Sequence, residues 1–493
     1  MIFLFIALPL VVAGLLPLLG RVSKQVLPDV LANAVLLFLL VESVLLGRDL
    51  AVTGPYVRTF SWMGEPVNLR LAVDGFSLFM LFTIALVGLA AGIFSIDYMK
   101  HYGSKANYYA LFLVMIAGMN GLVLSADLFN VYIFLEVAAV ASYALVAFGL
   151  ESDELEAAFK YLMLSVVASA FVLIGIAVLF GVTGDVSFAA VARGLQDTDS
   201  RWIVAACSAL YIMGFGLKAA LMPFHAWLPD AHPSAPAPIS AMLSGLLIKV
   251  SGVYALTRIF FNVFGMTPAL STVLMSLATF SMVAAAFLAL GQKDLKRMLA
   301  YSSISQVGYI VLGLGLGTPL GIAGGLFHLI NHAMAKGLLF LNSGSVQQAT
   351  GTRNLDEMGG LAKRMPVTAA TNLVGALSIA GVPPLNGFWS KLIIIIALVQ
   401  AGQWGFALAA VLASVLTLWY YLLIQRKAFF GKLDERWKDV REAPFWMLAS
   451  NVILALLCLG VGLFFALTIK TWIQPAADAL GQGVRIALGT WGM

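Results

Sequence analysis

The chain is 493 residues long, 61% hydrophobic and only 11% charged, and its mean hydropathy is +0.96. These values lie outside the range of soluble domains and indicate a protein that crosses a membrane many times. The formal net charge of +5 is small for this length and does not suggest nucleic-acid binding. The only two cysteines, Cys207 and Cys458, lie in apolar segments, which excludes a disulfide framework and a CxxC site.

Apolar segments follow one another along the whole chain. The first one, MIFLFIALPLVVAGLLPLLG, has no basic stretch before it, so we expect a spanning helix there and not a cleaved signal peptide. The polar piece SFAAVARGLQD between the sixth and seventh segments predicts an amphipathic helix on the membrane surface. The fourteen predicted spans have approximate cores at 2–20, 27–46, 74–96, 107–125, 128–149, 157–181, 202–228, 237–260, 268–290, 298–317, 321–346, 366–400, 405–425 and 445–469.

Positive charge is distributed unequally between the two sides that these spans define. Seventeen of the 29 lysine and arginine residues lie on the side reached after odd-numbered spans, eight lie on the opposite side, and four lie inside spans. Because lysine and arginine are retained on the cytoplasmic side, we expect both termini to face away from the cytoplasm. No polar stretch is long enough to fold by itself, so we predict one membrane domain over residues 1–493.

The seventh span is broken, and a lysine lies beside the break. It carries Lys218 and is interrupted at Pro223, and the next span carries Lys249. A proline break in a spanning helix is tolerated where it lines protein or a wet cavity, and a lysine at that depth costs several kcal/mol unless it faces such an interior. The alternative, a lysine that reaches the membrane surface, requires a position nearer a helix end. The pattern therefore indicates an ion pathway.

The twelfth span is broken in the same way. Pro383 and Pro384 interrupt it, and Lys391 follows. Two broken spans in corresponding halves are typical of inverted repeats with ion sites at the breaks. We therefore predict an all-α membrane protein of about fourteen helices, in which helices 4–8 (residues 107–260) and helices 9–13 (residues 268–425) form two inverted five-helix repeats. Residues 1–106 and 445–493 lie outside the repeats.

Other ionisable residues also lie inside predicted spans. Glu136 is the one acid of the fifth span, with Lys218 as its natural partner; the alternative is a neutral structural glutamate. In the eleventh span His328, His332 and Lys336 recur every four residues and so share a helix face, as a proton relay requires. Histidines held by hydrogen bonds in the core are an alternative. A zinc site is disfavoured, because only two ligands are present and the acid of H-E-x-x-H is missing.

The predicted proton-transfer residues are thus Glu136, Lys218, Lys249, His328, His332, Lys336 and Lys391, with helix breaks at Pro223, Pro383 and Pro384. Asn331 and Ser343 lie near the predicted relay of the eleventh span. Polar side chains that we expect to hold bridging waters, or simply to support helix packing, are Ser165, Ser240, Ser244, Tyr301, Ser302, Ser303, Ser305 and Asn386.

Five stretches carry a resemblance to a known family. They read LFNVYIFLEVAAVASYALVA, GLKAALMPFHAWLPDAHPSAPAPISAMLSGLLIKVSGVYALTR, LKRMLAYSSISQVGYI, HLINHAMAKGLLFLNSGSV and GVPPLNGFWSKL. The chain resembles the antiporter-like family that includes the D subunit of Mrp Na⁺/H⁺ antiporters and membrane subunits of complex I and membrane-bound hydrogenases. The resemblance implies that Glu136 and Lys218 are the paired acid and lysine, Lys249 the connecting lysine, the span-eleven histidines the central relay, and Lys391 the terminal lysine.

The resemblance also implies a function. We expect a proton-translocating subunit of a multi-subunit membrane complex, similar to the D subunit of an Mrp cation/proton antiporter. The alternatives are a proton-pumping subunit of a complex I-like or hydrogenase complex, or a non-conducting coupling subunit of another pump such as inorganic-carbon uptake. Lys391 favours the Mrp or hydrogenase type, because some complex I relatives have glutamate there. The piece GTRNLDEMGGLAKRMP before the twelfth span also resembles Mrp D and hydrogenase-type subunits. The sequence ends soon after the last predicted span, so we do not expect the long lateral helix of the largest antiporter-like subunits.

The expected partners and location follow from the same comparison. No flavin, quinone, Fe–S or nucleotide motif is present in the sequence, so we expect no cofactor, and any redox catalysis would occur in partner chains. The partners would be other membrane subunits, the lipid bilayer and H⁺, without nucleic acid; the sequence leaves open whether Na⁺ also passes through this chain. The predicted location is the inner (plasma) membrane.

Overall fold

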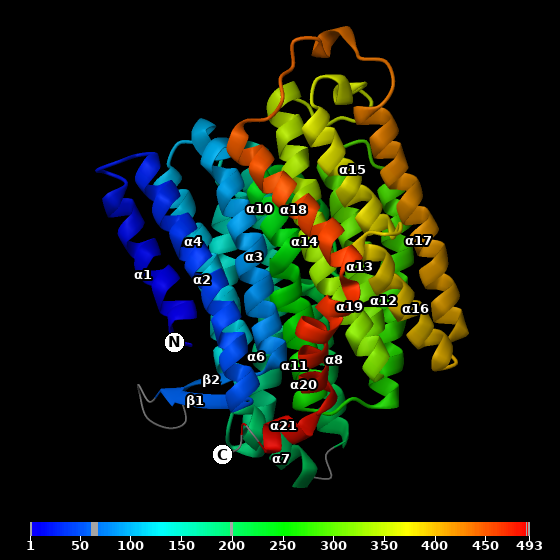
Figure 1. The fold of residues 1–493 in the computed structure, drawn as a ribbon. Coiled ribbons are helices and arrows are strands. Elements are labelled where there is room, and N and C mark those ends of the chain that lie inside the picture. Colours follow the sequence, from blue (N-terminus) through cyan, green and yellow to red (C-terminus); the bar gives the residue numbers. More distant parts are fainter. Residues whose placement is uncertain (1, 61–67, 198–200, 490, 492–493) are drawn as a thin grey trace.

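The computed structural model describes residues 2–60, 68–197, 201–489 and 491, and nearly all of its elements are helices of one elongated bundle (Figure 1). The α-helices are α1 (Leu4–Leu19), α2 (Val26–Thr53), α3 (Gly75–Tyr98), α4 (Lys105–Leu124), α5 (Leu128–Val146), α6 (Ser152–Thr183), α7 (Phe188–Asp197), α8 (Arg201–Lys218), α9 (Leu228–Ser234), α10 (Ala237–Met242), α11 (Ala255–Asn262), α12 (Pro268–Leu290), α13 (Leu295–Gly315), α14 (Pro319–Thr350), α15 (Pro366–Ala380), α16 (Asn386–Gln400), α17 (Trp404–Ile424), α18 (Phe445–Leu463), α19 (Phe465–Thr468), α20 (Gln474–Gly481) and α21 (Val484–Leu488). The π-helices are η2 (Leu243–Tyr254), η4 (Gln425–Phe429) and η6 (Ile469–Ile473), and the 3₁₀ turns are η1 (Met99–His101), η3 (Leu361–Lys363) and η5 (Glu435–Trp437).

This architecture confirms the predicted helical membrane fold. Within the described part of the chain, ten helices are long and apolar enough to cross a membrane. Three shorter apolar helices, α1, α15 and α16, add to them, and the last two are the halves of the predicted twelfth span. The predicted surface helix is α7. The exact count of fourteen spans stays a prediction.

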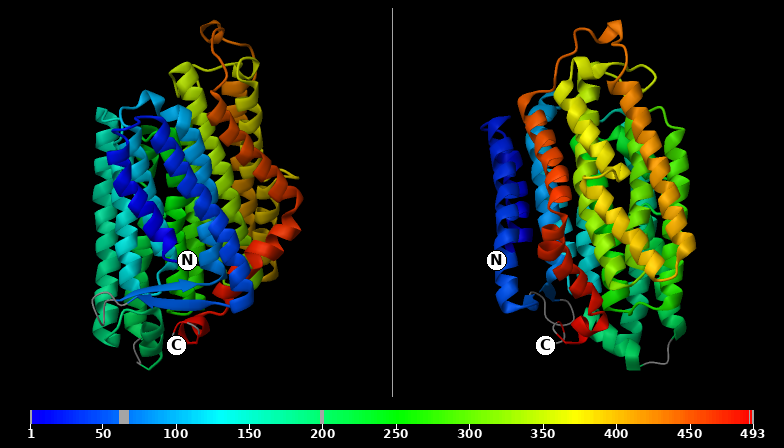
Figure 2. Two further views of the ribbon diagram at one scale, coloured as in Figure 1. Left: turned by 60° about the vertical axis from the view of Figure 1, so that its left-hand side comes forward. Right: turned by 45° about the vertical axis from the view of Figure 1, so that its right-hand side comes forward.

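The two ends of the bundle differ. One end carries the connections 20–25, 351–365 and 430–444, and we call it the basic end because most of the loop lysines and arginines are there (Figures 1 and 2). The other end carries α7, α21 and a β-hairpin that the sequence analysis did not predict, and we call it the hairpin end. In the hairpin, β1 (Tyr56–Phe60) pairs antiparallel with β2 (Leu69–Val73). Arg70 O accepts a hydrogen bond from Ala126 N, which ties the hairpin to the α4–α5 connection.

The two predicted repeats run through the bundle in opposite senses. The first set, α4 to α11, begins at the basic end, whereas the second set, α12 to α17, begins at the hairpin end (Figure 1). Each set of helices contains one of the two predicted breaks. The helix before the first break ends at Lys218, which is earlier than the predicted break at Pro223. The helix cannot continue because Ala220 has a φ of +55° and Pro223 supplies no N–H. The second break follows Ala380, where Gly381 has a φ of +86°.

The helix that follows the first break has an unexpected form. Residues Leu243–Tyr254 are a π-helix of 12 residues, which contains Lys249. Such helices are rare and usually only one turn long, and they concentrate at functional sites. Gly252 on this helix packs directly on the backbone of Ala219, so that no side chain fits between them. The π-helix is thereby pressed against the residue that follows Lys218.

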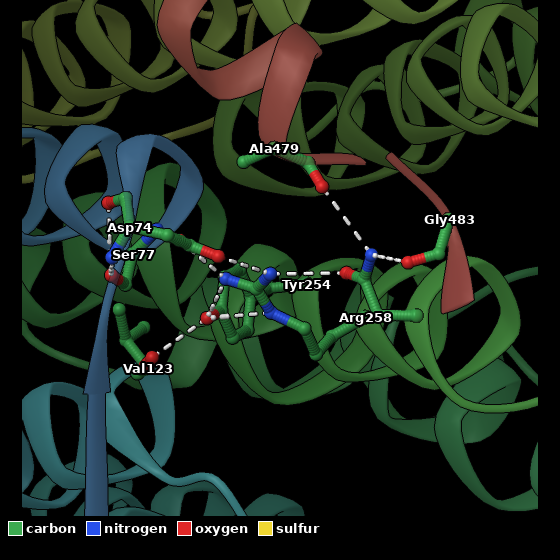
Figure 3. A network of polar contacts seen from close by, with 8 residues as sticks. Asp74, Ser77, Val123, Tyr254, Arg258, Ala479 and Gly483 are labelled. Carbon is green, nitrogen blue, oxygen red and sulfur yellow. Dashed lines mark hydrogen bonds and ion pairs between the residues drawn. The ribbon is translucent and has the colours of Figure 1, made fainter. Parts of the chain in front are cut away.

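A buried ion pair holds the hairpin end together (Figure 3). Asp74, the N-cap of α3, accepts two hydrogen bonds from Arg258 of α11, at 2.7 and 2.9 Å. Arg258 also donates to the hydroxyl of Tyr254, which itself donates to Val123 O at 2.7 Å. Asn262 connects the guanidinium to the C-terminal segment, because its amide donates to Gly483 O at 2.9 Å. The cluster therefore joins α3, α4, α11 and the segment after α20.

Candidate functional site

The acid and the lysine of the first break lie together. Glu136 projects from α5, and Lys218 is the last residue of α8; the distance from Lys218 Nζ to Glu136 Oε1 is 3.4 Å. Two α6 hydroxyls complete the group, because Ser165 accepts a hydrogen bond from Lys218 and Ser169 donates one to Glu136. Only 3% of the lysine side chain is exposed, compared with 27% of the glutamate side chain. The carboxylate thus lies at the edge of the bundle and the ammonium inside it.

Lys249 lies deeper, on the π-helix. Its side chain is fully buried, and Nζ donates to Ser244 O, the carbonyl five residues earlier. The Ser244 hydroxyl is 2.7 Å from the hydroxyl of Ser303 on α13. This contact links the first set of helices to the second. Of the polar residues noted in the sequence, Ser244 therefore contacts the predicted proton-transfer residue Lys249, and Ser303 contacts Ser244.

The two histidines of α14 have different surroundings. His328 is held from both sides, with Nδ1 2.9 Å from Ser390 Oγ and Nε2 3.1 Å from Gln306 Oε1. Both ring nitrogens of His332, by contrast, are buried without a hydrogen-bond partner among the described residues. The centres of the two rings are 6.4 Å apart. His328 therefore fits the alternative of a hydrogen-bonded core histidine as well as a relay, whereas His332 has two nitrogens free for water or a proton.

Lys336 and Lys391 lie in the second half of the molecule. Lys336 Nζ donates to Leu299 O and to the hydroxyl of Tyr421, both at 2.9 Å. Lys391 follows the second break on α16, and its Nζ is 3.5 Å from Ala380 O, the last carbonyl of α15. The same ammonium lies 4.6 Å from the ring centre of Tyr309, within range of a cation–π contact.

Three of the four lysines of this site have no acid among their hydrogen-bond partners within the described residues. Lys249, Lys336 and Lys391 are fully or almost fully buried, and their hydrogen-bond partners are carbonyl and hydroxyl oxygens. Burying an unpaired ammonium is so costly that such a group tends to lose its proton, which makes each of these lysines able to accept one. We call the seven predicted proton-transfer residues the buried row.

Several contacts of the buried row were not predicted from the sequence. Gln306, Ser390, Tyr309 and Tyr421 each touch one of its members, and the signal for them is no more than a polar residue in an apolar helix. The remaining polar candidates mostly bond to backbone. Ser240, Ser305 and Ser343 donate to His232 O, Met282 O and Phe340 O, and Asn331 donates to Asn386 O.

The structure also buries charged residues that the sequence analysis had not treated as internal. Lys105 and Lys296, counted with the loops, are 3% and 1% exposed, and Lys105 pairs with Asp29 at 2.7 Å. Glu42 of α2 is a buried acid inside a predicted span. No group of three or more histidines, cysteines or acids within the described ranges could hold a metal ion.

Known proteins share this sequence pattern and this arrangement of helices. A family model described as "NADH:quinone oxidoreductase/Mrp antiporter, TM" matches residues 125–417. A second, described as "NADH-Ubiquinone oxidoreductase (complex I), chain 5 N-terminus", matches residues 62–112. The chain is 35% identical to the N subunit of the NADH-quinone oxidoreductase of Desulforudis audaxviator, over 96% of this chain and 97% of that protein. It is 33% identical to the D subunit of the Na⁺/H⁺ antiporter of Alkalihalophilus pseudofirmus, over 88% of this chain and 87% of that protein.

Solved structures give the same result for the whole fold. A chain of the Mrp complex from Dietzia superposes with a TM-score of 0.91 at 29% identity, with 99% of both chains covered. A chain of the archaeal membrane-bound sulfane sulfur reductase superposes with a TM-score of 0.90 at 31% identity, again with 99% of both chains covered.

Proposed function

The chain belongs to the NADH:quinone oxidoreductase/Mrp antiporter family, and from this premise we propose that it is the proton-translocating subunit of a multi-subunit membrane complex of the Mrp cation/proton antiporter type. The observation that carries the proposal is the buried row. Four lysines and two histidines are buried in the bundle, with the partly exposed carboxylate of Glu136 beside one of the lysines, and a scaffold would have no reason to bear the desolvation cost of these buried groups.

The proposed pathway begins and ends at the two helix breaks. Lys218, held by Glu136 at 3.4 Å, controls the first half, and Lys391 beside the freed carbonyl of Ala380 controls the second. Lys249 and the α14 residues lie between them. A positive charge that arrives next to a protonated lysine favours release of its proton, so protons can be passed along the row without a large domain movement.

The partial exposure of Glu136 supports the proposal that this chain is one subunit of a complex. The Glu136 side chain is 27% exposed at the edge of the bundle. If no other subunit covered it, its carboxylate would meet lipid hydrocarbon, which is costly for a charged group. A neighbouring membrane subunit that covers this part of α5 removes that cost. The antiporter and respiratory chains with which this chain superposes come from multi-subunit membrane complexes, which supports partner subunits of the same kind.

A second candidate is the membrane subunit of a complex I-like or hydrogenase-type complex. The 35% identity to the N subunit of an NADH-quinone oxidoreductase and the TM-score of 0.90 with the sulfane sulfur reductase chain favour it. The two candidates differ in the driving reaction and not in the role of the buried row. Mass spectrometry of the complex purified through this chain separates them: antiporter-type small subunits support the first, and hydrophilic redox subunits support the second.

The orientation and location are also part of the proposal. Because lysine and arginine accumulate at the basic end, we place that end in the cytoplasm and both termini on the other side of the plasma membrane. Protons from the cytoplasm would then enter at the basic end and leave at the hairpin end, or the reverse during antiport.

The first test removes either member of the Glu136–Lys218 pair. Breaking a buried pair leaves a charge that costs about 3–5 kcal/mol or that becomes neutral. We therefore expect Glu136→Gln and Lys218→Ala each to abolish proton transport while the complex still assembles. Transport is measured by ΔpH-driven fluorescence quenching in inverted vesicles, with assembly checked by blotting. The matched control is Glu435→Gln, whose side chain is 87% exposed. Wild-type transport in either assembled variant would refute the proposed function.

A further inference from the structure

A groove between α2 and α3 lies open on the surface of the bundle at the basic end. It has a volume of about 650 Å³, and the first turn of α18 borders it (Figure 1). Its apolar lining comes from one face of each helix, because the residues recur at helical spacing. They include Val26, Val30, Ala34 and Leu37 on α2, and Leu89 and Ile96 on α3. Val26, Val30 and Leu37 are each more than half exposed, so the chain itself does not cover this face. We call it the α2–α3 groove.

The groove is about as deep as one leaflet of a bilayer. The rise of α2 from Val26 to Leu37 is about 17 Å, and half of the hydrocarbon core is about 15 Å. Farther along α3, toward the hairpin end, the ring of Phe82 is covered by the indole of Trp472, with ring centres 4.0 Å apart. A helix of a partner subunit that crosses the membrane would need an open seam about 30 Å long. The depth therefore fits one acyl chain better than a helix.

The end of the groove that faces the membrane surface is polar. Lys100 lines it, is 50% exposed, and has its Nζ 2.6 Å from Asp97 Oδ1. An ammonium has three N–H donors, so two of them remain for other acceptors. Trp446, the second residue of α18, also lines this end and is 44% exposed. Tryptophan is enriched where lipid headgroups meet the hydrocarbon. This end of the groove therefore has the donors and the position that suit the phosphate of a lipid.

An acceptor lies beside these donors. The carboxylate of Asp29 lines the groove and is 12% exposed, while its oxygens hold Lys105 at 2.7 and 3.0 Å. A carboxylate has about four lone-pair sites, so it can accept a further N–H. Asn33, one turn deeper, donates to Asp29 O at 2.8 Å. Among the described residues, the charged side chains that line the groove are thus one acid and one lysine. The excess of lysine and arginine that attracts anionic lipids is not present in this lining.

We propose that the α2–α3 groove binds one phospholipid with a primary ammonium headgroup, a phosphatidylethanolamine, from the leaflet on the basic-end side. One acyl chain lies along Val30, Ala34 and Leu37, Lys100 donates to the phosphate, and the headgroup ammonium donates to Asp29. A choline headgroup has no N–H for the last bond, and a glycerol headgroup has no cation for it. The bound lipid joins α2 and α3 to the start of α18. The inference goes beyond the proposed function and does not depend on it.

The test uses the purified complex in vesicles of dioleoyl phosphatidylcholine that contain a small fraction of phosphatidylethanolamine with a diazirine in its acyl chain. After irradiation, we expect mass spectrometry to find the label on residues 26–37 of α2 and 89–100 of α3. Ala34→Trp places an indole in the groove and should lower this labelling about tenfold or more, because several methylene groups lose their contact. The matched control is Leu45→Trp, on the same helix but outside the groove and 40% exposed, which should label as the wild type does.

Unlabelled lipids test the headgroup. Phosphatidylethanolamine should compete with the probe about tenfold better than phosphatidylcholine or phosphatidylglycerol, since only it makes the charged hydrogen bond to Asp29. Lys100→Ala should lower labelling about tenfold by removing a charged hydrogen bond to the phosphate, and Lys100→Arg should retain it.

Three results would overturn the inference. One is wild-type labelling in an assembled Ala34→Trp variant; if that variant does not assemble, wild-type labelling in Lys100→Ala, whose side chain is exposed, has the same meaning. Another is equal competition by the three lipids, which indicates only the mobile lipid that surrounds any membrane protein. The third is capture of another subunit of the complex by a photoreactive benzoylphenylalanine in place of Val30, which would make the groove a subunit interface.

Discussion

Lys391 has two possible roles at the scale of the single residue. It follows the second helix break, and its ammonium is 3.5 Å from the carbonyl of Ala380 and 4.6 Å from the ring centre of Tyr309. The first role is to hold and release a proton at the end of the buried row. The second is only to neutralise the carbonyl that the break leaves without a helical partner. Both roles are compatible with these distances, so substitutions must separate them.

Lys391→Ala and Lys391→Glu distinguish these roles. If Lys391 transfers protons, alanine should stop turnover, whereas glutamate should retain part of it, because a carboxylate also carries a proton. If the lysine only satisfies the carbonyl, alanine should mainly reduce the amount of folded protein. The measurement is ΔpH-driven quenching in inverted vesicles beside a blot for the intact complex, with Lys432→Ala, an exposed lysine, as control. Normal assembly with wild-type pumping in Lys391→Ala would exclude the proton-transfer role.

The sequence indicated those ionisable side chains of the bundle whose signal is local, and their role in proton transfer stays a prediction. A lysine or glutamate in an apolar segment, such as Glu136 or Lys218, stands out by itself, and the break at Pro223 is visible without any knowledge of packing. The partners of His328 were not predictable, because Gln306 and Ser390 come from two other helices and their contact depends on how those helices pack. The burial of His232 was not predictable for a different reason. It belongs to the polar, proline-rich piece between two spans, which is typical of an exposed connection, yet the structure buries it completely.

At the scale of the element, the breaks were predictable and the form of the following helix was not. In the sequence itself, Pro223 marks the break after α8, and Gly381, Pro383 and Pro384 mark the break after α15. The π-helical form of Leu243–Tyr254 leaves no such mark, because the change from α to π register alters backbone hydrogen bonds without changing the apolar pattern. The β-hairpin was missed because its strands are only five residues long and only β2 has a buried half.

The Asp74–Arg258 pair determines how firmly α11 is fixed at the hairpin end. Asp74→Asn keeps the size of the side chain and its ability to cap α3, but leaves the buried guanidinium of Arg258 without its counter-charge. We expect a loss of about 3–5 kcal/mol in stability, seen as a lower temperature of thermal unfolding of the purified complex. Asp49→Asn, an exposed acid near the same end, is the control. The double variant Asp74→Leu/Arg258→Met should recover much of the loss, because no buried charge remains. An unchanged unfolding temperature in Asp74→Asn would show that the pair does not stabilise this end.

At the scale of the whole molecule, the basic end and the hairpin end are the two sides between which we propose that protons move. Ser234 lines a polar hollow at the basic end. Arg48, near the end of α2, lies at the hairpin end, where it lines a separate hollow beside α20. The two positions are therefore on opposite sides of a membrane that surrounds the bundle. In the orientation that we propose from the excess of lysine and arginine, the basic end faces the cytoplasm.

Labelling of single cysteines tests this orientation. In a background in which Cys207 and Cys458, both buried, are replaced by alanine, we expect Ser234→Cys to react with a membrane-impermeant maleimide only when the cytoplasmic face is accessible, as in inverted vesicles. Arg48→Cys should react only from the opposite face, as in intact cells. A blot for the assembled complex shows that each variant is folded, and permeabilised membranes show that each cysteine can react at all. Labelling of both from the same face would refute the topology. Labelling of each from the face opposite to the expected one would keep the fold but reverse the orientation, and would place the basic end on the outer side of the membrane.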